Sequence, residues 1–219
     1  MHDTAPRLLV VAHGTASTTG SATTGRLVEG VRAARPGVHV DLCFLDVADP
    51  RLTAVLDDRP TIVVPLLLST GYHVQSDIPA ALAAYPQVRA ARHLGPHPLL
   101  VDALLDRLPD GEGEPVLVGA GSSRAEARAE LDETARLLGE RLGRRVPAFT
   151  MADDLRAAFG ERAPVRVATY LLADGQFVDT LTAAADGLGP VAAPIGVHPA
   201  LVELVWRRYD EAVPFGGVR

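Results

Sequence analysis

The chain has 219 residues and a formal net charge of −6, with 47% of its residues hydrophobic and 22% charged. This composition is typical of a globular protein. Without a block of basic residues, nucleic acid is excluded as an expected partner, because phosphate binding needs a concentrated basic face. Cys43 is the only cysteine, which excludes a disulfide framework and a thiolate metal cluster within one chain.

The apolar runs of the sequence are short. The longest of them, over residues 62–68, is far below the roughly 18 residues that a membrane span needs. The apolar stretch at 8–12 is too short for the core of a signal peptide. We therefore expect a cytoplasmic protein that has no membrane partner.

Apolar runs alternate with amphipathic stretches along the chain. The apolar runs lack strict alternation, which is typical of strands buried on both faces of a parallel sheet. In the first half we predict strands over 7–12, 38–45, 61–67 and 88–93, and helices over 24–35, 50–56, 74–85 and 98–108. In the second half we predict strands over 116–118, 145–150, 165–170 and 189–192, and helices over 124–142, 153–158, 178–188 and 199–209.

The sequence contains an internal repeat. Residues 67–74 (LLSTGYHV) recur as 171–178 (LLADGQFV), and residues 94–98 (LGPHP) recur as 195–199 (IGVHP). Residues 11–15 (VAHGT) recur more weakly as 118–122 (VGAGS). The repeat predicts an α/β fold of two homologous lobes, residues 1–110 and 115–219, joined by a linker rich in Gly, Pro and acid. We expect each lobe to be a parallel four-stranded sheet flanked by helices, with a cleft between the lobes.

Two histidines follow predicted strands of the first lobe. His13 comes directly after the first strand, and His73 follows the third strand across a short loop. The carboxyl ends of parallel strands meet at one edge of the sheet, where such folds bind ligands, so the two side chains can converge on one metal ion. Asp46, at the end of the second strand, is a candidate third ligand or proton acceptor. Asp77 begins the next predicted helix, and we interpret it as a helix cap.

The second half serves as an internal control for these residues. His13 is matched by Ala120 and His73 by Phe177, so both histidines are lost together while the surrounding pattern is kept. This paired loss indicates that they form one functional unit, present only in the first lobe. His97 and His198 are retained in both halves, each before a proline, which favours a structural role at the start of a helix.

The sequence resembles the CbiX-type sirohydrochlorin chelatases, in the long bacterial form with two fused repeats. The matching segments are 11–14 (VAHG), 44–50 (FLDVADP) and 64–79 (VPLLLSTGYHVQSDIP). The resemblance implies an ATP-independent class II chelatase that has an open cleft for the tetrapyrrole and binds the incoming metal through His13 and His73. The family usually has Glu where this chain has Asp46, and Ser-Arg where it has Thr15 and Ala16.

Sirohydrochlorin carries eight carboxylates, so its site should offer Arg side chains and backbone N–H groups. The expected substrate contacts are Gly14, Thr15, Ser69, Gly71, Tyr72, Arg92 and Arg124, and Arg128 is a further candidate for the carboxylates. The metal, Fe²⁺, Co²⁺ or Ni²⁺, is expected as a substrate and not as a permanently bound cofactor, in siroheme or cobalamin biosynthesis. Because the fused repeat replaces a dimer, we expect a monomer.

Two alternative functions follow from the same residues. Histidine phosphatases also place a His-Gly pair after a strand, but Ala12 stands where their Arg should be. The second alternative is a non-catalytic tetrapyrrole or metal carrier on a chelatase scaffold, which the departures at Thr15, Ala16 and Asp46 keep open. Turnover distinguishes a carrier from an enzyme.

Overall fold

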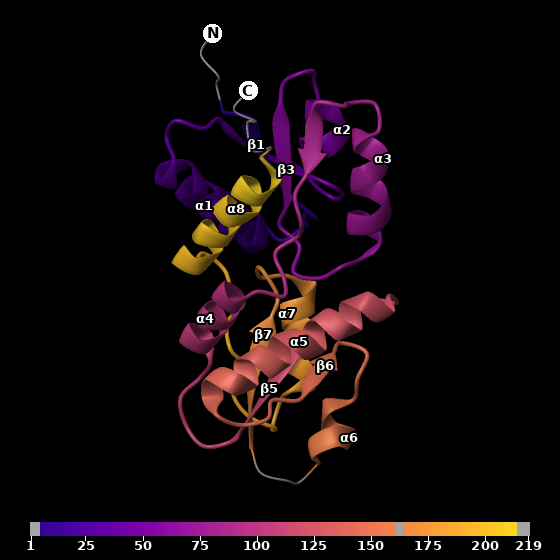
Figure 1. The fold of residues 1–219 in the computed structure, drawn as a ribbon. Coiled ribbons are helices and arrows are strands. Elements are labelled where there is room, and N and C mark those ends of the chain that lie inside the picture. Colours follow the sequence, from indigo (N-terminus) through magenta and orange to yellow (C-terminus); the bar gives the residue numbers. More distant parts are fainter. Residues whose placement is uncertain (1–4, 161–163, 214–219) are drawn as a thin grey trace.

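Two all-parallel sheets form the framework of the protein (Figure 1). The structure is a computed structural model that describes residues 5–160 and 164–213. The first sheet has the order β2-β1-β3-β4, formed by β1 (Arg7–Ala12), β2 (Val40–Phe44), β3 (Thr61–Pro65) and β4 (Val88–Ala90). The second sheet has the order β6-β5-β7, formed by β5 (Glu114–Gly119), β6 (Ala148–Thr150) and β7 (Val165–Tyr170).

Helices connect the strands of each sheet. They are α1 (Thr18–Ala34), α2 (Leu52–Val55), the π-helical turn η1 (His73–Asp77), α3 (Ile78–Leu82), α4 (Pro98–Arg107), α5 (Ala125–Leu142), α6 (Leu155–Phe159), α7 (Gln176–Ala184) and α8 (Pro199–Ala212). The prediction of an α/β fold with parallel sheets and flanking helices is confirmed. In each sheet the first strand of that half lies in the middle, between the second and the third.

The second sheet corrects one prediction, because among the described residues it has three strands and not four. The segment predicted as a strand over 189–192 meets β7 only through an isolated bridge between Val191 and Val167. Two backbone hydrogen bonds hold it there, and Pro190 lacks the N–H group that a longer ladder would need. The segment therefore runs beside β7 without becoming a strand of the sheet.

The first helix starts earlier than the sequence predicts. α1 begins at Thr18, although we predicted residue 24, because the small and polar residues before Thr24 were interpreted as a loop. Ser17 caps the helix, and its Oγ accepts a hydrogen bond from the Gly20 N–H at 3.1 Å. A serine in this position satisfies one of the N–H groups that the first helical turn leaves without a partner.

The two halves of the chain exchange their last helices. α8, at the end of the second half, packs on α1 and β3 of the first sheet, while α4, at the end of the first half, packs on α5 and β7 of the second sheet. Figure 1 shows α8 (yellow) beside α1 and α4 (magenta) beside the second sheet. The side chains under these helices belong to one continuous core that spans both sheets, including Leu100 and Leu204. Separate cores lie on the outer faces, under α2 and α3 and under α6 and α7.

Several polar contacts fix α8 to the first half. Asp210 accepts two hydrogen bonds from the Arg35 guanidinium, at 2.6 and 2.7 Å, and this guanidinium lies 4.4 Å from the ring centroid of Trp206. The buried Trp206 ring donates its indole N–H to the Val31 carbonyl at 3.1 Å. A planar guanidinium suits both the bidentate carboxylate contact and the aromatic stacking.

A buried polar cluster also joins the halves. Glu130 of α5 accepts hydrogen bonds from the backbone N–H and the hydroxyl of Thr70, at 2.6 and 2.8 Å. His93 lies against the same carboxylate, with its Nε2 atom 3.0 Å from Oε1. Burial lowers the pKa of His93, and the neighbouring Glu130 opposes that shift.

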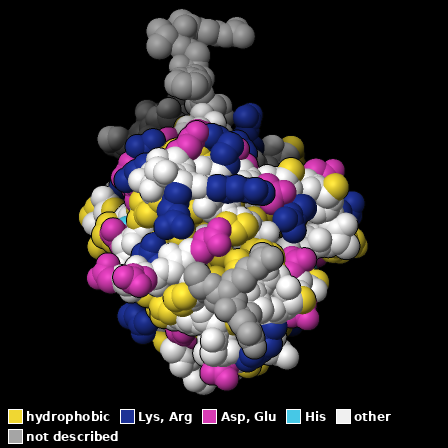
Figure 2. All heavy atoms as spheres, turned by 90° about the horizontal axis from the view of Figure 1, so that it is seen from below, with side chains coloured by type: hydrophobic (Ala, Val, Ile, Leu, Met, Phe, Trp, Pro, Cys, Tyr) yellow, Lys and Arg dark blue, Asp and Glu magenta, His cyan; other side chains and the backbone are white. Residues whose placement is uncertain are grey.

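The outer surface carries charges of both signs. On the face seen in Figure 2, Arg side chains (blue) and acidic side chains (magenta) are interspersed. On α5 they pair within the helix, as Arg128 does with Asp132 and Arg136 does with Glu133. In the part of the chain that the structure describes, no helix is both long and apolar enough to cross a membrane.

We expect the His93→Gln variant to lose less stability in acid than the wild-type protein does. Burial lowers the pKa of His93 from its ordinary value of 6.5, against Glu130 and together with Arg92 and Arg208. The unfolded chain therefore takes up a proton near that value while the folded chain stays neutral, so the free energy of unfolding falls as the pH drops below it. Urea denaturation at several pH values measures this slope, and equal slopes in both proteins would contradict the assignment.

The exchange of helices predicts that the two halves unfold together. Leu204 is fully buried between α8 and the shared core, so Leu204→Ala should lower the free energy of unfolding by about 2–5 kcal/mol. The fluorescence of the single tryptophan, Trp206, and far-UV circular dichroism should give coincident urea transitions in the wild type and in the variant. Two separated transitions would mean that the halves unfold independently.

Candidate metal-binding site

The first candidate histidine extends from the central strand of the first sheet. β1 ends at Ala12, and the His13 carbonyl accepts a hydrogen bond from the Asp46 N–H at 2.8 Å, so the loops after β1 and β2 run side by side. Gly14 has a φ of +98°, and a Cβ atom added there would lie 1.9 Å from the Asp46 carbonyl oxygen. Only glycine fits this turn, which aims the His13 side chain away from the sheet.

The second candidate histidine opens the π-helical turn after β3. The His73 carbonyl accepts a hydrogen bond from the Ile78 N–H, five residues ahead, which closes this wider turn. The structure brings the rings of His13 and His73 together, with centroids 4.7 Å apart and planes 75° apart. Single π-helical turns inside helices are frequent at functional sites.

Both imidazole rings have one nitrogen in a hydrogen bond. The Nδ1 atom of His13 lies 3.1 Å from the Gly14 carbonyl oxygen, and Nδ1 of His73 lies 2.5 Å from Oδ2 of Asp77. Each of these oxygens is an acceptor, which assigns the proton to Nδ1 and leaves the lone pair on Nε2. A carboxylate or carbonyl behind a histidine orients metal-binding imidazoles in the same way.

Asp77 corrects our interpretation of this residue as a helix cap. Its side chain makes no capping hydrogen bond at the start of α3. The carboxylate reaches back along the turn to His73, an i,i+4 pair in which both side chains are partly exposed. A π-helical turn continues directly into α3, so the first N–H groups of α3 already have partners.

Asp46 lies close to the histidine pair, but it is held by another side chain. Its Oδ1 atom accepts hydrogen bonds from Arg51 and from the Val47 N–H, both at 2.8 Å. The hydrogen bond from Arg51 lowers the pKa of the Asp46 carboxyl, with smaller contributions from Val47 and from the charge of His13. Within residues 5–160 and 164–213, no three His, Cys, Asp or Glu side chains form a metal-binding group, so Asp46 is not assembled with the pair.

Val47 next to this carboxylate has a strained backbone. Its φ is +65°, the only positive φ of a non-glycine residue among the described residues, and its side chain is 51% exposed. A β-branched residue in the left-handed region is a true outlier, and such strain concentrates at functional sites. The hydrogen bond from the Val47 N–H to Asp46 holds this conformation.

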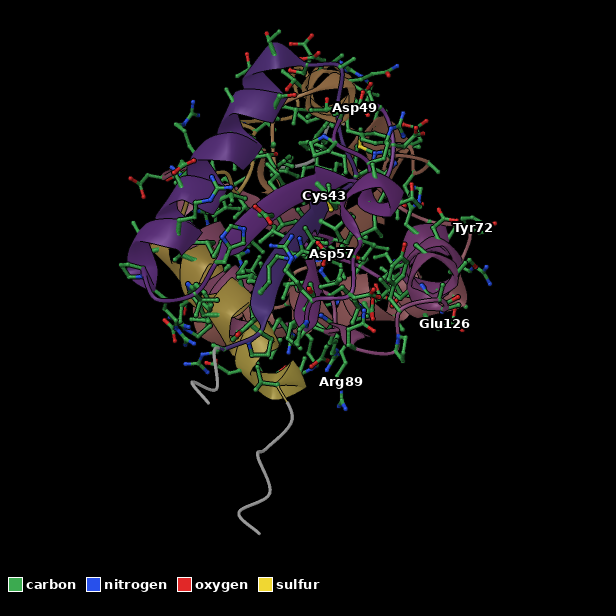
Figure 3. The ribbon with its side chains drawn as sticks, turned by 90° about the horizontal axis from the view of Figure 1, so that it is seen from above. Cys43, Asp49, Asp57, Tyr72, Arg89 and Glu126 are labelled. Carbon is green, nitrogen blue, oxygen red and sulfur yellow. The ribbon has the colours of Figure 1, made fainter. Side chains whose placement is uncertain are left out.

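A pocket of about 820 Å³ opens beside His13 and is lined by both halves of the chain. Four of the predicted substrate contacts line it, namely Gly14, Thr15, Ser69 and Gly71. Three others, Tyr72, Arg92 and Arg124, are not among its lining residues. Tyr72 is 62% exposed and lies at the edge of the molecule in Figure 3, with its ring centroid 6.4 Å from that of His73.

The second half of the chain lines much of the pocket, and several of these residues were not predicted from the sequence. Phe177, which the predicted repeat aligns with His73, lines the pocket and is 57% exposed. Arg128 of α5, one of the arginines expected from the sequence to bind substrate carboxylates, lines it as well, together with Gly121, Thr150 and Asp153. The repeat alignment contained a signal for Phe177, because it matches the histidine position, but we used the second half only as a control.

His97, His198 and the cysteine have structural positions. His97 and His198 cap α4 and α8, where their Nδ1 atoms accept hydrogen bonds from the N–H groups of Leu99 and Ala200, each at 3.1 Å. Their predicted role at helix starts is confirmed. Cys43 is fully buried, and burial raises the pKa of its thiol to about 12; Figure 3 shows it in the interior of the molecule.

Comparisons with known proteins agree with this architecture. The family model CbiX matches residues 7–111. A sirohydrochlorin ferrochelatase from Priestia megaterium is 29% identical over 149 residues, which is 60% of this chain and 56% of the relative, so the match spans little more than half of that protein.

Two solved structures share the whole fold. SirB from Bacillus subtilis with Fe³⁺ superposes with a TM-score of 0.80 at 21% identity, and the match covers 94% of this chain and 95% of that one. The sirohydrochlorin chelatase SirB from Bacillus subtilis subspecies spizizenii, in complex with cobalt, gives a TM-score of 0.81 at 22% identity, covering 94% of each chain.

We expect the Val47→Gly variant to be as stable as the wild type or more stable, by up to about 1 kcal/mol. The left-handed conformation costs a non-glycine residue about 1–2 kcal/mol, which exceeds the roughly 0.5–1 kcal/mol that glycine loses through its flexible unfolded state. Urea denaturation measures the difference. Val197→Gly, at an exposed valine outside the left-handed region, is the matched control and should be destabilising. A Val47→Gly variant destabilised as much as the control would contradict the strain.

Proposed function

Because the CbiX family model matches residues 7–111, we propose that this chain is an ATP-independent chelatase that inserts a divalent metal ion into sirohydrochlorin. The metal ion is a substrate of this reaction, and Fe²⁺ and Co²⁺ are the proposed ions. The names of the similar proteins support this reading, since they include a sirohydrochlorin ferrochelatase and a sirohydrochlorin chelatase in complex with cobalt.

The observation that carries the proposal is the pair of imidazole rings, in which His13 lines the pocket and His73, outside the pocket lining, contacts the His13 ring. With Nδ1 of His13 and of His73 each in a hydrogen bond, both rings keep an Nε2 lone pair for a metal ion. Imidazole nitrogen suits first-row ions such as Fe²⁺ and Co²⁺. The two histidines would hold the metal at one face of the macrocycle while the pyrrole N–H protons leave.

The pocket has the size and polarity for a flat, carboxylate-bearing macrocycle. Its volume of about 820 Å³ lies in the range of ligand sites, and Leu66, Val47 and Phe177 offer apolar contacts for the ring. We propose that this pocket is the open cleft between the lobes and that Gly14, Thr15, Ser69 and Gly71 contact the substrate there.

Arginines would bind the substrate carboxylates. Arg128 lines the pocket, and it also bonds Asp132, with both Nε distances at 3.1 Å. Residues 119–122, in the loop before α5, lie in the same wall, and we propose that their backbone N–H groups bind a carboxylate as well. Arg92, Arg124 and the exposed Tyr72 lie outside the pocket lining, so contacts from them would need propionate or acetate arms that extend beyond the pocket rim.

Asp46 would act beside the histidine pair. Its lowered pKa keeps it negatively charged at neutral pH, where it attracts the incoming cation and the protons that leave the pyrroles. To become a direct ligand, Asp46 would have to leave Arg51. We therefore propose that it guides the metal electrostatically and ligates only in a complex where this ion pair opens.

The same proposal extends to the organisation of the chain. We propose that residues 1–110 form the repeat that carries the metal site and that residues 115–219 form a degenerate repeat that has lost both histidines. The two repeats in one chain supply both walls of the pocket, which supports a monomer as the active form. The reaction would serve siroheme or cobalamin biosynthesis in the cytoplasm.

A carrier that binds metal or tetrapyrrole without turnover is the second candidate. One observation favours it: in the part of the chain that the structure describes, the third candidate ligand, Asp46, is bound to Arg51. A carrier needs affinity but no proton acceptor. The two candidates differ in turnover, which a single assay measures.

We expect the purified protein to convert sirohydrochlorin catalytically when Co²⁺ or Fe²⁺ is supplied under anaerobic conditions. Absorbance spectroscopy against a blank without enzyme measures this conversion. His13→Ala and His73→Ala should each lower the rate to that of the blank, because one imidazole alone holds the metal too weakly. His39→Ala is the matched control, since His39 is exposed and pairs with Asp41 away from the site.

Each outcome of this assay has a clear meaning. A stoichiometric spectral shift without turnover would favour the carrier. Full activity in both histidine variants would contradict the proposed mechanism, even if the wild-type protein is a chelatase. Loss of activity in His39→Ala would mean that the assay reports folding and not chemistry.

A further inference from the structure

The segment that leads from β3 to His73 is held by the second half of the chain. Two of its residues, Leu68 and Thr70, contact side chains of that half. The Tyr170 hydroxyl donates a hydrogen bond to the Leu68 carbonyl at 2.9 Å. The Glu130 carboxylate accepts one from the Thr70 N–H at 2.6 Å and one from the Thr70 hydroxyl at 2.8 Å. The last of these anchors lies three residues before His73.

The contact between Glu130 and Thr70 is largely shielded from water. Thr70 is 8% exposed, and the side chains of Glu130 and His93 are 17% and 7% exposed. A carboxylate in such surroundings is tolerated only when hydrogen bonds surround it, and here Thr70 and His93 supply them. Short hydrogen bonds to an ionised group are also the stronger ones, so this cluster restrains the Thr70 backbone tightly.

Tyr170 reinforces the same segment from β7. Its ring is buried, and burial raises the pKa of its hydroxyl, which therefore stays a neutral donor. Gly95 packs against both partners, since a Cβ atom added there would lie 2.1 Å from the Tyr170 hydroxyl and 2.2 Å from the Leu68 carbonyl oxygen. The three groups interlock and leave little freedom for the backbone at Leu68.

Among the described residues, the matching segment of the second half, at 171–175, is not held by an equivalent pair of side chains from the first half. Thr23 stands in the first repeat where Glu130 stands in the second, counting from the aligned residues His13 and Ala120. The segment at 171–175, which matches the segment before His73, is instead met by the bare backbone of Gly20: a Cβ atom added there would lie 2.3 Å from the Asp174 carbonyl oxygen. A carboxylate, that of Glu130, therefore holds the segment before His73, whereas Thr23 stands at the matching position for the segment before Phe177.

We propose that Glu130 and Tyr170 are positioning residues, which fix the segment from Leu68 to Gly71 and thereby set the place of His73 opposite His13. The second half then contributes to metal binding without supplying a ligand. Glu130 acts through the Thr70 backbone, and His93 keeps the carboxylate in place. This inference rests on the proposed function, because it assumes that the two histidines bind the incoming metal.

The test measures binding of Co²⁺ alone, followed by its visible absorption in an anaerobic titration. Glu130→Gln should weaken Co²⁺ binding by about 10-fold or more and alter the absorption bands, as losing a group that orients a metal-binding histidine does. Glu126→Gln is the matched control: Glu126 is exposed, sits one turn earlier on α5 and is labelled in Figure 3. Its Co²⁺ affinity should equal that of the wild type.

Tyr170→Phe provides a second variant, should the Glu130 substitution impair folding. It removes only the hydroxyl that bonds Leu68, and we expect a several-fold loss of Co²⁺ affinity. Hydrogen exchange of the segment at 66–75 should rise in both variants at a temperature where each remains folded. In the His73→Ala background, adding Glu130→Gln should produce no further loss of affinity, because the residue that it positions is gone.

These readouts separate the positioning role from the proposed function. Unchanged Co²⁺ affinity and absorption in both Glu130→Gln and Tyr170→Phe would overturn the inference, as would a wild-type protein that does not bind Co²⁺. A further loss in the His73→Ala background would also overturn it, because Glu130 would then act by another route. If the wild type binds Co²⁺ but does not convert sirohydrochlorin, the chelatase proposal fails, and the affinities still decide the role of Glu130.

Discussion

A parallel sheet has two apolar faces, and helices must cover both of them. In this chain one face of each sheet is covered from the other half, because α8 packs on the first sheet and α4 on the second. The side chains under these helices form one core across both sheets, so the halves cannot separate without exposing it to water. The relative placement of the sheets, and with it the pocket at their carboxyl ends, depends on this shared core.

The two halves of the chain contribute different kinds of side chain to the pocket and its surroundings. The first half supplies His13, which lines the pocket, and His73, which contacts the His13 ring. The second half supplies a wall with Phe177 and Arg128, and its Glu130 and Tyr170 side chains bond the segment before His73. If the second half is the proposed degenerate repeat, these contacts explain why the rest of its framework is retained. The apolar wall suits the face of a macrocycle, and the histidine side suits the cation, so the asymmetry of the repeats matches the asymmetry of the proposed reaction.

The sequence predicted the two parallel sheets, apart from the strand at 189–192, and the meeting of the two histidines. Both depend on local patterns, because apolar runs mark buried strands and strand ends share an edge of the sheet. The sequence did not predict which sheet α8 would cover, since an amphipathic helix shows that it has an apolar face but not what that face meets. The three-stranded second sheet was missed for a similar reason, because the apolar pattern at 189–192 does not reveal how few hydrogen bonds Pro190 permits. The role of Glu130 could not be predicted either, because its hydrogen-bond partner, Thr70, is 60 residues away in the sequence.

The site also departs from local rules at several residues around the histidine pair. Val47 is strained, η1 is widened into a π-helical turn, and Asp46 is bound by Arg51 in place of completing a ligand set with the histidines. A closed tetrahedral set of ligands holds a structural ion firmly, whereas sites that exchange their ligands keep open positions. Two imidazoles with a carboxylate held nearby form such an open set. In the proposed reaction the metal is handed on to a macrocycle, which requires such incomplete coordination, and the proposed positioning by Glu130 and Tyr170 would supply the rigidity that missing ligands otherwise provide.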